Sequence, residues 1–158
     1  VACRRAKLTD LGQIIRLGKR FLRVSSSAFQ RIDFSHASSY LTSFIVNSDC
    51  LTLVAERDDQ ILGILMLAKQ ACWWNLNEAF VRNDLFISCG EGEKLLRDGC
   101  DWALRDTRVK RIEIAVDSGI RMDRAVKFLE REGFAANGFS MVLDRKAEKS
   151  EESVIWAA

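Results

Sequence analysis

The stretch Asp84-Leu-Phe-Ile-Ser-Cys-Gly-Glu-Gly-Glu-Lys-Leu-Leu96 carries the pattern that decides the fold. It starts as an apolar, strand-like run, breaks at Gly90-Glu-Gly92 and then becomes helical at once. A strand that ends in Gly-x-Gly at a helix N-terminus leaves backbone N–H groups pointing outward, with the positive end of the helix dipole behind them. This arrangement suits an anion such as a phosphate. Two glycines before a helix also serve simply to give a turn positive φ, and both interpretations stay open.

The composition indicates one folded domain. The 158 residues are 48% hydrophobic and 29% charged, and the net charge is +2. These values exclude a disordered chain and a strongly basic nucleic-acid binder. We expect one domain over residues 1–144 and a charged tail over residues 145–158, with an apolar tip at Val154–Ala158.

The cysteines and the apolar runs predict the compartment. Five widely spaced cysteines without a Cys-x-x-Cys pair, and a single histidine, predict reduced thiols and no metal site. No apolar run approaches the roughly 20 residues that a membrane span needs, and the first residues lack the apolar core of a signal peptide. We therefore expect a cytoplasmic protein, or one inside a particle assembled in the cytoplasm. We expect no membrane partner and no specific nucleic-acid partner.

The first half of the chain predicts a short strand, two helices and a hairpin. Val1–Arg5 is strand-like, Thr9 is the expected N-cap of the first helix, and the second helix covers about Asp33–Val46. The side chains expected to face inward from the two helices are Leu11, Ile14, Ile15, Phe21 and Leu22, then Tyr40, Leu41, Phe44 and Ile45. Leu51–Glu56 and Gln60–Leu67 form a hairpin around Asp58-Asp59, and the continuous apolar second arm predicts a central strand.

The second half alternates strands and helices. The expected elements are a strand at Glu78–Ile87, a helix at about Glu93–Arg105, a strand at Lys110–Val116, a helix capped by Asp123 and ended by Gly133, and a strand at Phe139–Leu143. The inward residues of the helix before Lys110 are Leu95, Leu96, Cys100, Ala103 and Leu104. The resulting order β, α, α, β, β, β, α, β, α, β predicts an α/β (α+β) fold, a mixed central sheet with helices on both faces.

This order, together with the strand, loop and helix of Lys110–Phe134, resembles the GNAT superfamily of acyl-CoA-dependent N-acetyltransferases over about Ala2–Asp144. The second half is the more specific part of this resemblance, and its helix closes with the pair Gly133-Phe134. The second half is also similar to short acetyltransferase-like proteins of bacteriophages. The resemblance implies acetyl-CoA as cofactor and an amine, on a small molecule or a protein, as acceptor. It places the pantetheine arm beside Leu85–Ile87 and the pyrophosphate at Ser88–Lys94. The cofactor-binding residues that it implies are Phe86, Ile87, Ser88, Cys89, Gly90, Glu91, Gly92 and Lys94.

Several positions depart from the pattern of that family. Ile87 stands where an Arg or Gln usually precedes the glycines, Leu129 where a Tyr often protonates the thiolate, and Met122 where an Asn is frequent. Glu91 and Glu93 repel a pyrophosphate, which only Lys94 and the helix dipole attract. These departures support an alternative function, a catalytically inactive module of the same fold with a structural or interaction role, for example a phage or virion component.

Acetyl transfer to an amine requires a general base, for which Glu78 and Asp84 are the candidates. The alternative interpretation is that both are ordinary solvent-facing residues of an alternating strand. Cys89 is either an activated nucleophile at the helix start or a small turn residue. His36 either lines an acceptor pocket or is a polar helix-face residue.

Trp73 and Trp74 fall in an expected loop, Ala71–Asn77. We expect one of them to be buried and the other exposed, or both to bind a protein partner or a second copy together with Trp156 of the tail. The basic run Arg105, Arg108, Lys110 and Arg111 either meets an adenosine 3′-phosphate or an acidic partner, or is a solvated turn.

Overall fold

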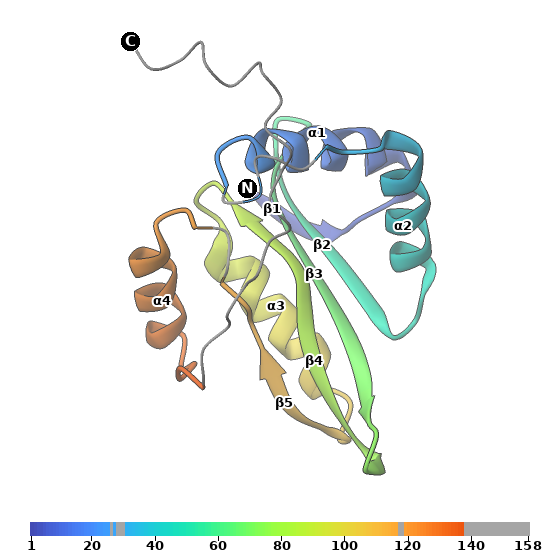
Figure 1. Ribbon diagram of the computed structural model, residues 1–158, viewed down its shortest axis with the longest axis vertical. Coiled ribbons are helices and arrows are strands. Elements are labelled where there is room, and N and C mark those ends of the chain that lie inside the picture. Colours follow the sequence, from blue (N-terminus) through green and yellow to red (C-terminus); the bar gives the residue numbers. More distant parts are fainter. Residues whose placement is uncertain (26, 28–30, 117–118, 138–158) are drawn as a thin grey trace, which may run out of the picture.

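The computed structural model describes residues 1–25, 27, 31–116 and 119–137, which build a central five-stranded sheet with helices on both faces (Figure 1). The strands are β1 (Ala2–Arg5), β2 (Cys50–Arg57), β3 (Gln60–Cys72), β4 (Asn75–Ser88) and β5 (Val109–Glu113). The helices are η1 (Leu8–Asp10), α1 (Leu11–Leu22), α2 (Phe34–Val46), α3 (Gly92–Leu104) and α4 (Met122–Arg131). The predicted α/β fold with a mixed sheet is therefore confirmed. The strand predicted at Phe139–Leu143 and the tail lie outside the described residues.

The sheet keeps the strands in sequence order, β1-β2-β3-β4-β5. The pairs β1-β2, β2-β3 and β3-β4 are antiparallel, and β5 is parallel to β4 because α3 carries the chain back along the sheet. The predicted hairpin turn at Asp58-Asp59 is confirmed, since both residues have positive φ, 50° and 58°. Two consecutive positive φ angles are the geometry of a two-residue turn whose twist matches that of the strands.

Two hydrophobic cores lie on opposite faces of β3. Helices α1 and α2 cover the face of Ile64 and Met66, and α3 covers the face of Leu65 and Leu67. All four side chains are almost completely buried, which confirms the prediction that this strand is central. On the second face α3 lies very close to the sheet: a Cβ at Gly99 would be 2.8 Å from Leu65 Cδ2 and 2.9 Å from Leu67 Cδ1.

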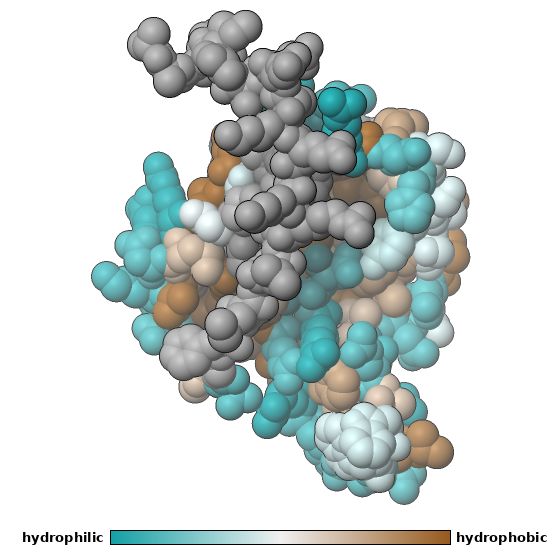
Figure 2. All heavy atoms as spheres, viewed as in Figure 1, coloured by the Kyte–Doolittle hydropathy of each residue, from teal (hydrophilic) through white to brown (hydrophobic). Residues whose placement is uncertain are grey.

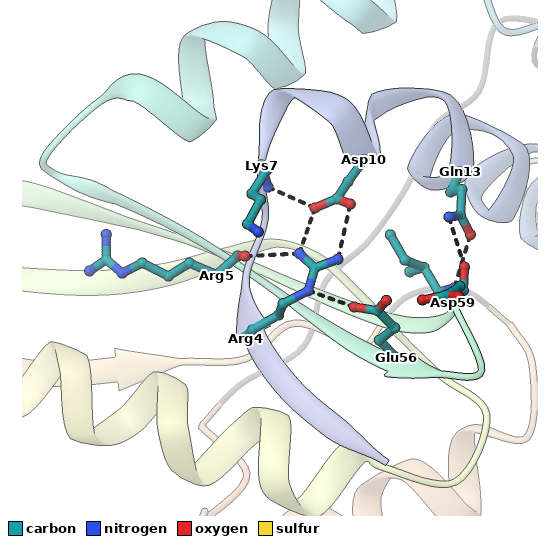
Figure 3. Close-up of polar contacts among 8 residues, drawn as sticks. Arg4, Arg5, Lys7, Asp10, Gln13, Glu56 and Asp59 are labelled. Atoms are coloured by element: carbon teal, nitrogen blue, oxygen red, sulfur yellow. Dashed lines mark hydrogen bonds and ion pairs between the residues drawn. The ribbon is translucent and has the colours of Figure 1, made fainter.

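A polar cluster fastens the first strand to the first helix (Figure 3). The Arg4 guanidinium donates to both carboxylate oxygens of Asp10, at 2.7 and 3.0 Å, and to Glu56 on β2 at 2.5 Å. Asp10 also accepts a hydrogen bond from the Lys7 backbone N–H at 2.7 Å. This carboxylate thus provides an acceptor for a backbone donor just before the first helical turns. The prediction of Thr9 as the N-cap was wrong, because Thr9 lies inside the 3-10 turn and Asp10 stands at the N-cap of α1.

The end of α4 is as predicted. Gly133 has φ 91°, its N–H donates to the Glu130 carbonyl, and the Phe134 N–H donates to the Leu129 carbonyl. These two bonds form a Schellman motif, which needs a residue in the left-handed region and therefore favours glycine. Asp123 is not the cap that we predicted, because it lies in the first turn of the helix, after Arg121 and Met122.

Several side chains that were expected to face inward are exposed. Leu104 is 62% exposed and Tyr40 is 42% exposed. The expectation of one buried and one exposed tryptophan was wrong as well, since Trp73 is 87% exposed and Trp74 is 63% exposed. Strands β3 and β4 run further than the alternation indicated, so the two tryptophans occupy a tight turn between long strands and not a loop.

Candidate functional site

Strands β4 and β5 separate halfway along β4. Their pairing runs from Ala79↔Val109 to Arg82↔Glu113, whereas β4 continues to Ser88. At the point of separation the Asn83 side chain spans the gap: its Oδ1 accepts from the Ala115 N–H at 2.6 Å and its Nδ2 donates to the Ala115 carbonyl at 3.3 Å. Beyond Asn83, β4 has no paired strand on this side in the described part of the chain. Among the described residues, this edge thus presents unpaired backbone groups of the kind with which an extended ligand pairs.

Asp84 is the extra residue of a β-bulge that begins the open edge. Leu67 pairs with Asn83 and Met66 pairs with Leu85, so Asp84 has no partner on β3. Its carboxylate accepts a hydrogen bond from the Tyr40 hydroxyl of α2 at 2.9 Å. Partial burial, and then this bond, raise the pKa of Tyr40 to about 12. The structure thus joins Asp84, a predicted base, to Tyr40, which sequence reasoning had assigned to the core.

The open edge leads into the N-terminus of α3. Gly90 has φ 120°, a conformation that favours glycine, and Glu91 at the N-cap makes no side-chain capping bond. The first backbone N–H groups of a helix have no intrahelical acceptor, so this end presents donors and a positive dipole. A Cβ on Gly92 would lie 3.2 Å from Ser88 Oγ and 3.4 Å from the Phe86 ring. Phe86, Ser88 and Gly92 therefore come together around the turn.

Ion pairs offset the acidic residues of this turn. Glu91 lies 3.7 Å from the Arg57 guanidinium of β2, and Glu93 lies 2.8 Å from Arg97, one turn along α3. Lys94 is occupied by Asp98 at 2.8 Å, and this hydrogen bond raises the pKa of Lys94. The repulsion expected from the two glutamates is thus reduced by partners on β2 and α3, and Lys94 is directed along its own helix.

The apolar departures from the family pattern are core residues. Ile87 is buried in the core shared with α1 and α2, and Leu129 is the buried residue of α4. Phe128 packs beside Phe86 with ring centroids 6.4 Å apart, so α4 lies next to the open edge of β4. Neither Leu129 nor Phe128 carries a proton that a leaving thiolate can accept.

Of the other sequence candidates, Glu78 and His36 lie apart from this site, whereas Cys89 lies beside its turn. Glu78 is near the opposite end of β4, about 30 Å from Ser88 at the rise of an extended strand. Cys89 is exposed beside the turn, and His36 is an exposed residue in the first turn of α2 whose N–H donates to Asp33. Asn83 and Tyr40 were missed, and the polar residues just before the apolar run, Asn83-Asp84, were the available signal for the first of them.

A groove of about 480 Å³ lies elsewhere, between α1 and the start of β3. The residues that line it are Gln13, Arg16, Lys19, Arg20, Arg23, Gln60, Ile61 and Leu62. Within the described ranges no group of acidic residues, cysteines and histidine could hold a metal ion. None of the described helices combines the length and the hydropathy that crossing a bilayer requires.

No protein-family model and no curated protein matches the chain. Solved structures do match its fold. A protein described as an acetyltransferase from Agrobacterium tumefaciens strain C58 superposes with a TM-score of 0.72 at 12% identity, over 92% of this chain and 100% of the other. A ribosomal-protein-alanine N-acetyltransferase from Brucella melitensis gives 0.64 at 14% identity, over 92% and 99%.

An aminoglycoside acetyltransferase from an uncultured soil sample, in complex with sisomicin, gives a TM-score of 0.65 at 17% identity, over 91% of this chain and 94% of the other. These identities are too low to carry an activity from one chain to another, whereas the superpositions cover nearly the whole length of each partner. The chain therefore has the fold that these acetyltransferases share.

Proposed function

We propose that this protein is an acetyl-CoA-dependent N-acetyltransferase that acylates an amine. The observation that carries the proposal is the open edge of β4, Asp84–Ser88, which runs directly into the uncapped N-terminus of α3. An amide-containing arm fits an unpaired strand edge, and a pyrophosphate fits the donors of a helix N-terminus. Acetyl-CoA combines these two groups. Two of the acetyltransferases named above are named for different acceptors, a ribosomal-protein alanine and an aminoglycoside, so the fold accommodates acceptors of different chemical classes.

In this proposal, each group of residues around the open edge of β4 has a separate role. The β4 backbone and the turn at Gly90–Gly92 bind the cofactor, which supplies the acetyl group as a thioester. Phe86 and Phe128 form the apolar wall between the edge and α4. Asp84 accepts the proton of the amine, directly or through water, and Tyr40 holds the Asp84 carboxylate in place.

A second candidate function, a non-catalytic module of the same fold, is favoured by one observation. Leu129 is buried at the position that carries a Tyr in many members of the family that the sequence resembles, and its neighbour Phe128 is also apolar. The departure of a thiolate then relies on water or on another acid. Binding of acetyl-CoA separates the two candidates, because a module of this kind has no need of the cofactor.

Isothermal titration with acetyl-CoA and with free CoA tests the proposal. We expect micromolar binding that weakens with salt. Gly92→Asp should weaken it roughly 10-fold or more, since one charge about 5 Å from a doubly charged pyrophosphate costs about 1.7 kcal/mol even in water. An aspartate in the first turn of a helix is otherwise favourable, so the fold should persist.

Gly12→Asp is the matched control, because it adds the same carboxylate to the first turn of α1, away from the proposed site. Equal weakening by both variants, or no weakening by Gly92→Asp, would remove the turn from consideration. No binding by the wild type at millimolar ligand would favour the non-catalytic module.

A further inference from the structure

The hairpin of β3 and β4 extends beyond the rest of the sheet as a two-stranded finger. Pairing with β2 begins at Cys50↔Ala68 and pairing with β5 begins at Ala79↔Val109. Residues 69–78 thus have no neighbouring strand on either side within the described chain, and they form the lower end of the molecule in Figure 1. The base of the finger is braced by Lys69, whose ammonium lies 3.4 Å from Asp106 and 4.5 Å from the Trp102 ring centroid.

The tip of the finger is apolar and exposed. Trp73 is 87%, Trp74 is 63% and Leu76 is 79% exposed, and the two indole rings meet edge to face with centroids 5.4 Å apart. The ladder skips from Ala71↔Ala79 to Cys72↔Asn75, which leaves the segment around Leu76 outside the pairing. The tip protrudes from the surface at the bottom of Figure 2. A patch of large apolar side chains at the end of a marginal two-stranded element marks an interaction site.

Cations lie at the base of the finger. The α3–β5 turn lies against the finger, since the Ala79 N–H donates to the Arg108 carbonyl at 2.8 Å. Arg105 ends α3 just before this turn and Lys110 is in β5 just after it, and neither has an ion-pair partner among the residues described. The carboxylates of this end include Glu78, Asp49 and Asp106. The Lys69 N–H donates to the Asp49 carbonyl at 2.8 Å, and Asp106 is already shared by Arg108 at 2.8 Å and Lys69.

We propose that the finger inserts its tip into the headgroup layer of an anionic lipid bilayer. Tryptophan is favoured at that depth because its ring is apolar and its N–H is polar. Leu76 adds an apolar group to the tip. This group favours lipid over single-stranded nucleic acid as the ligand, because a leucine side chain contributes nothing to stacking on a base. The cations then lie near the lipid phosphates and carboxylates, where each basic residue adds to the attraction. This site is separate from the cofactor edge and does not depend on the proposed function.

Size and charge argue against a protein as the occupant. Three side chains of this kind bury roughly 500 Å², less than the ~800 Å² per partner of a standard protein interface, whereas insertion into a headgroup layer needs only a tip about 5–10 Å deep. Pairing of two tips would also bring two sets of cations together. The expectation of no membrane partner rested on the absence of a long apolar run, which concerns spanning segments only.

Co-sedimentation of the full chain with lipid vesicles tests this inference. We expect binding to vesicles of phosphatidylcholine with phosphatidylserine, decreasing with salt, and little binding to phosphatidylcholine alone. Replacing both tryptophans of the tip, Trp73→Ser with Trp74→Ser, should lower the partition constant at least about tenfold. A tenfold change corresponds to the loss of one large buried apolar side chain. The charge reversal Arg105→Glu with Lys110→Glu should remove the preference for anionic lipid.

Two matched controls use other parts of the surface. Val24→Ser with Val46→Ser removes apolar side chains that are exposed elsewhere, and Arg16→Glu with Arg20→Glu reverses two charges on α1. Both controls should bind as the wild type does. The inference is overturned if the wild type ignores the mixed vesicles, if the tip variant binds equally well, or if the controls lose as much binding. Tryptophan-dependent capture of single-stranded DNA or of a second copy, without vesicle binding, would likewise overturn it.

Discussion

Replacing Gly99 by alanine should destabilise the protein, although the same change normally stabilises a helix. Alanine gains about 1 kcal/mol over glycine inside a helix. At Gly99, however, the new methyl group would lie 2.8 Å from Leu65 and 2.9 Å from Leu67, whose side chains are almost completely buried and have little room to move. Overpacking of a core costs about 1–3 kcal/mol, and two such contacts belong in the upper part of that range. The net loss of unfolding free energy should be about 1–2 kcal/mol.

Gly18→Ala is the matched control for this prediction. Gly18 lies inside α1, and a Cβ there has no atom within 4 Å, so the full helix gain of up to about 1 kcal/mol should appear. Urea unfolding followed by circular dichroism measures both, and the slope m should stay constant. Thermal midpoints should move in opposite directions, by about 2–4 °C per kcal/mol for a chain of this size.

A Gly99→Ala variant as stable as Gly18→Ala would show that α3 moves away from β3 without cost. A second test is the double change Gly99→Ala with Leu67→Val, which removes one of the two contacting methyl groups. The double variant should lose less unfolding free energy than the two single variants lose together, and the difference should be about 0.5 kcal/mol or more.

Two further predictions concern pH. Hydrogen bonding to Arg4 lowers the pKa of Asp10, so its stabilisation is present above the unfolded pKa of about 3.9 and is lost as the pH falls. Asp10→Asn should cost about 1.5–3 kcal/mol at pH 7 and clearly less at pH 3 in urea titrations, and equal costs at both would contradict this. The pKa of Tyr40 is raised to about 12, so its bond to Asp84 stabilises below pH ~10 and is lost as the pH rises. Tyr40→Phe should remove this loss of unfolding free energy at alkaline pH, which is under about 1 kcal/mol for a side chain this exposed. If the variant loses as much stability above pH ~10 as the wild type, the bond to Asp84 is not its cause.

Local signals predicted those parts of the fold that local backbone chemistry determines. Asp58-Asp59 and Gly133 adopt positive φ as expected, and the apolar arm after Gln60 is the central strand. Contacts between distant segments were not predictable in the same way. Thr9 was a good capping residue by type, but the bond between Arg4 and Asp10 determines where α1 starts.

The sequence predicted where the turn of the candidate site lies, but not which side chains from other elements come together beside it. The turn at Gly90–Gly92 follows from the sequence, because glycine and a change of period mark it. The role of Asn83 depends on Ala115, 32 residues away, and that of Asp84 depends on Tyr40, 44 residues away. Helical periodicity put Tyr40 in the core, because its spacing from Phe44 is that of an apolar stripe, yet its hydroxyl reaches the surface of β4.

The bulge at Asp84 divides β4 into two half-strands that are out of phase. Before it, Ala79 and Val81 face α3; after it, Leu85 and Ile87 face α1 and α2. Loss of the Asp84 codon would make Asn83 and Leu85 consecutive, in the register that they already have against Leu67 and Met66, so Leu85 and Ile87 would keep their face of the sheet. Only the bulge and the bond from Tyr40 to Asp84 would be lost. The extra residue therefore positions a carboxylate beside Tyr40 and is not needed for the two half-strands to face their cores.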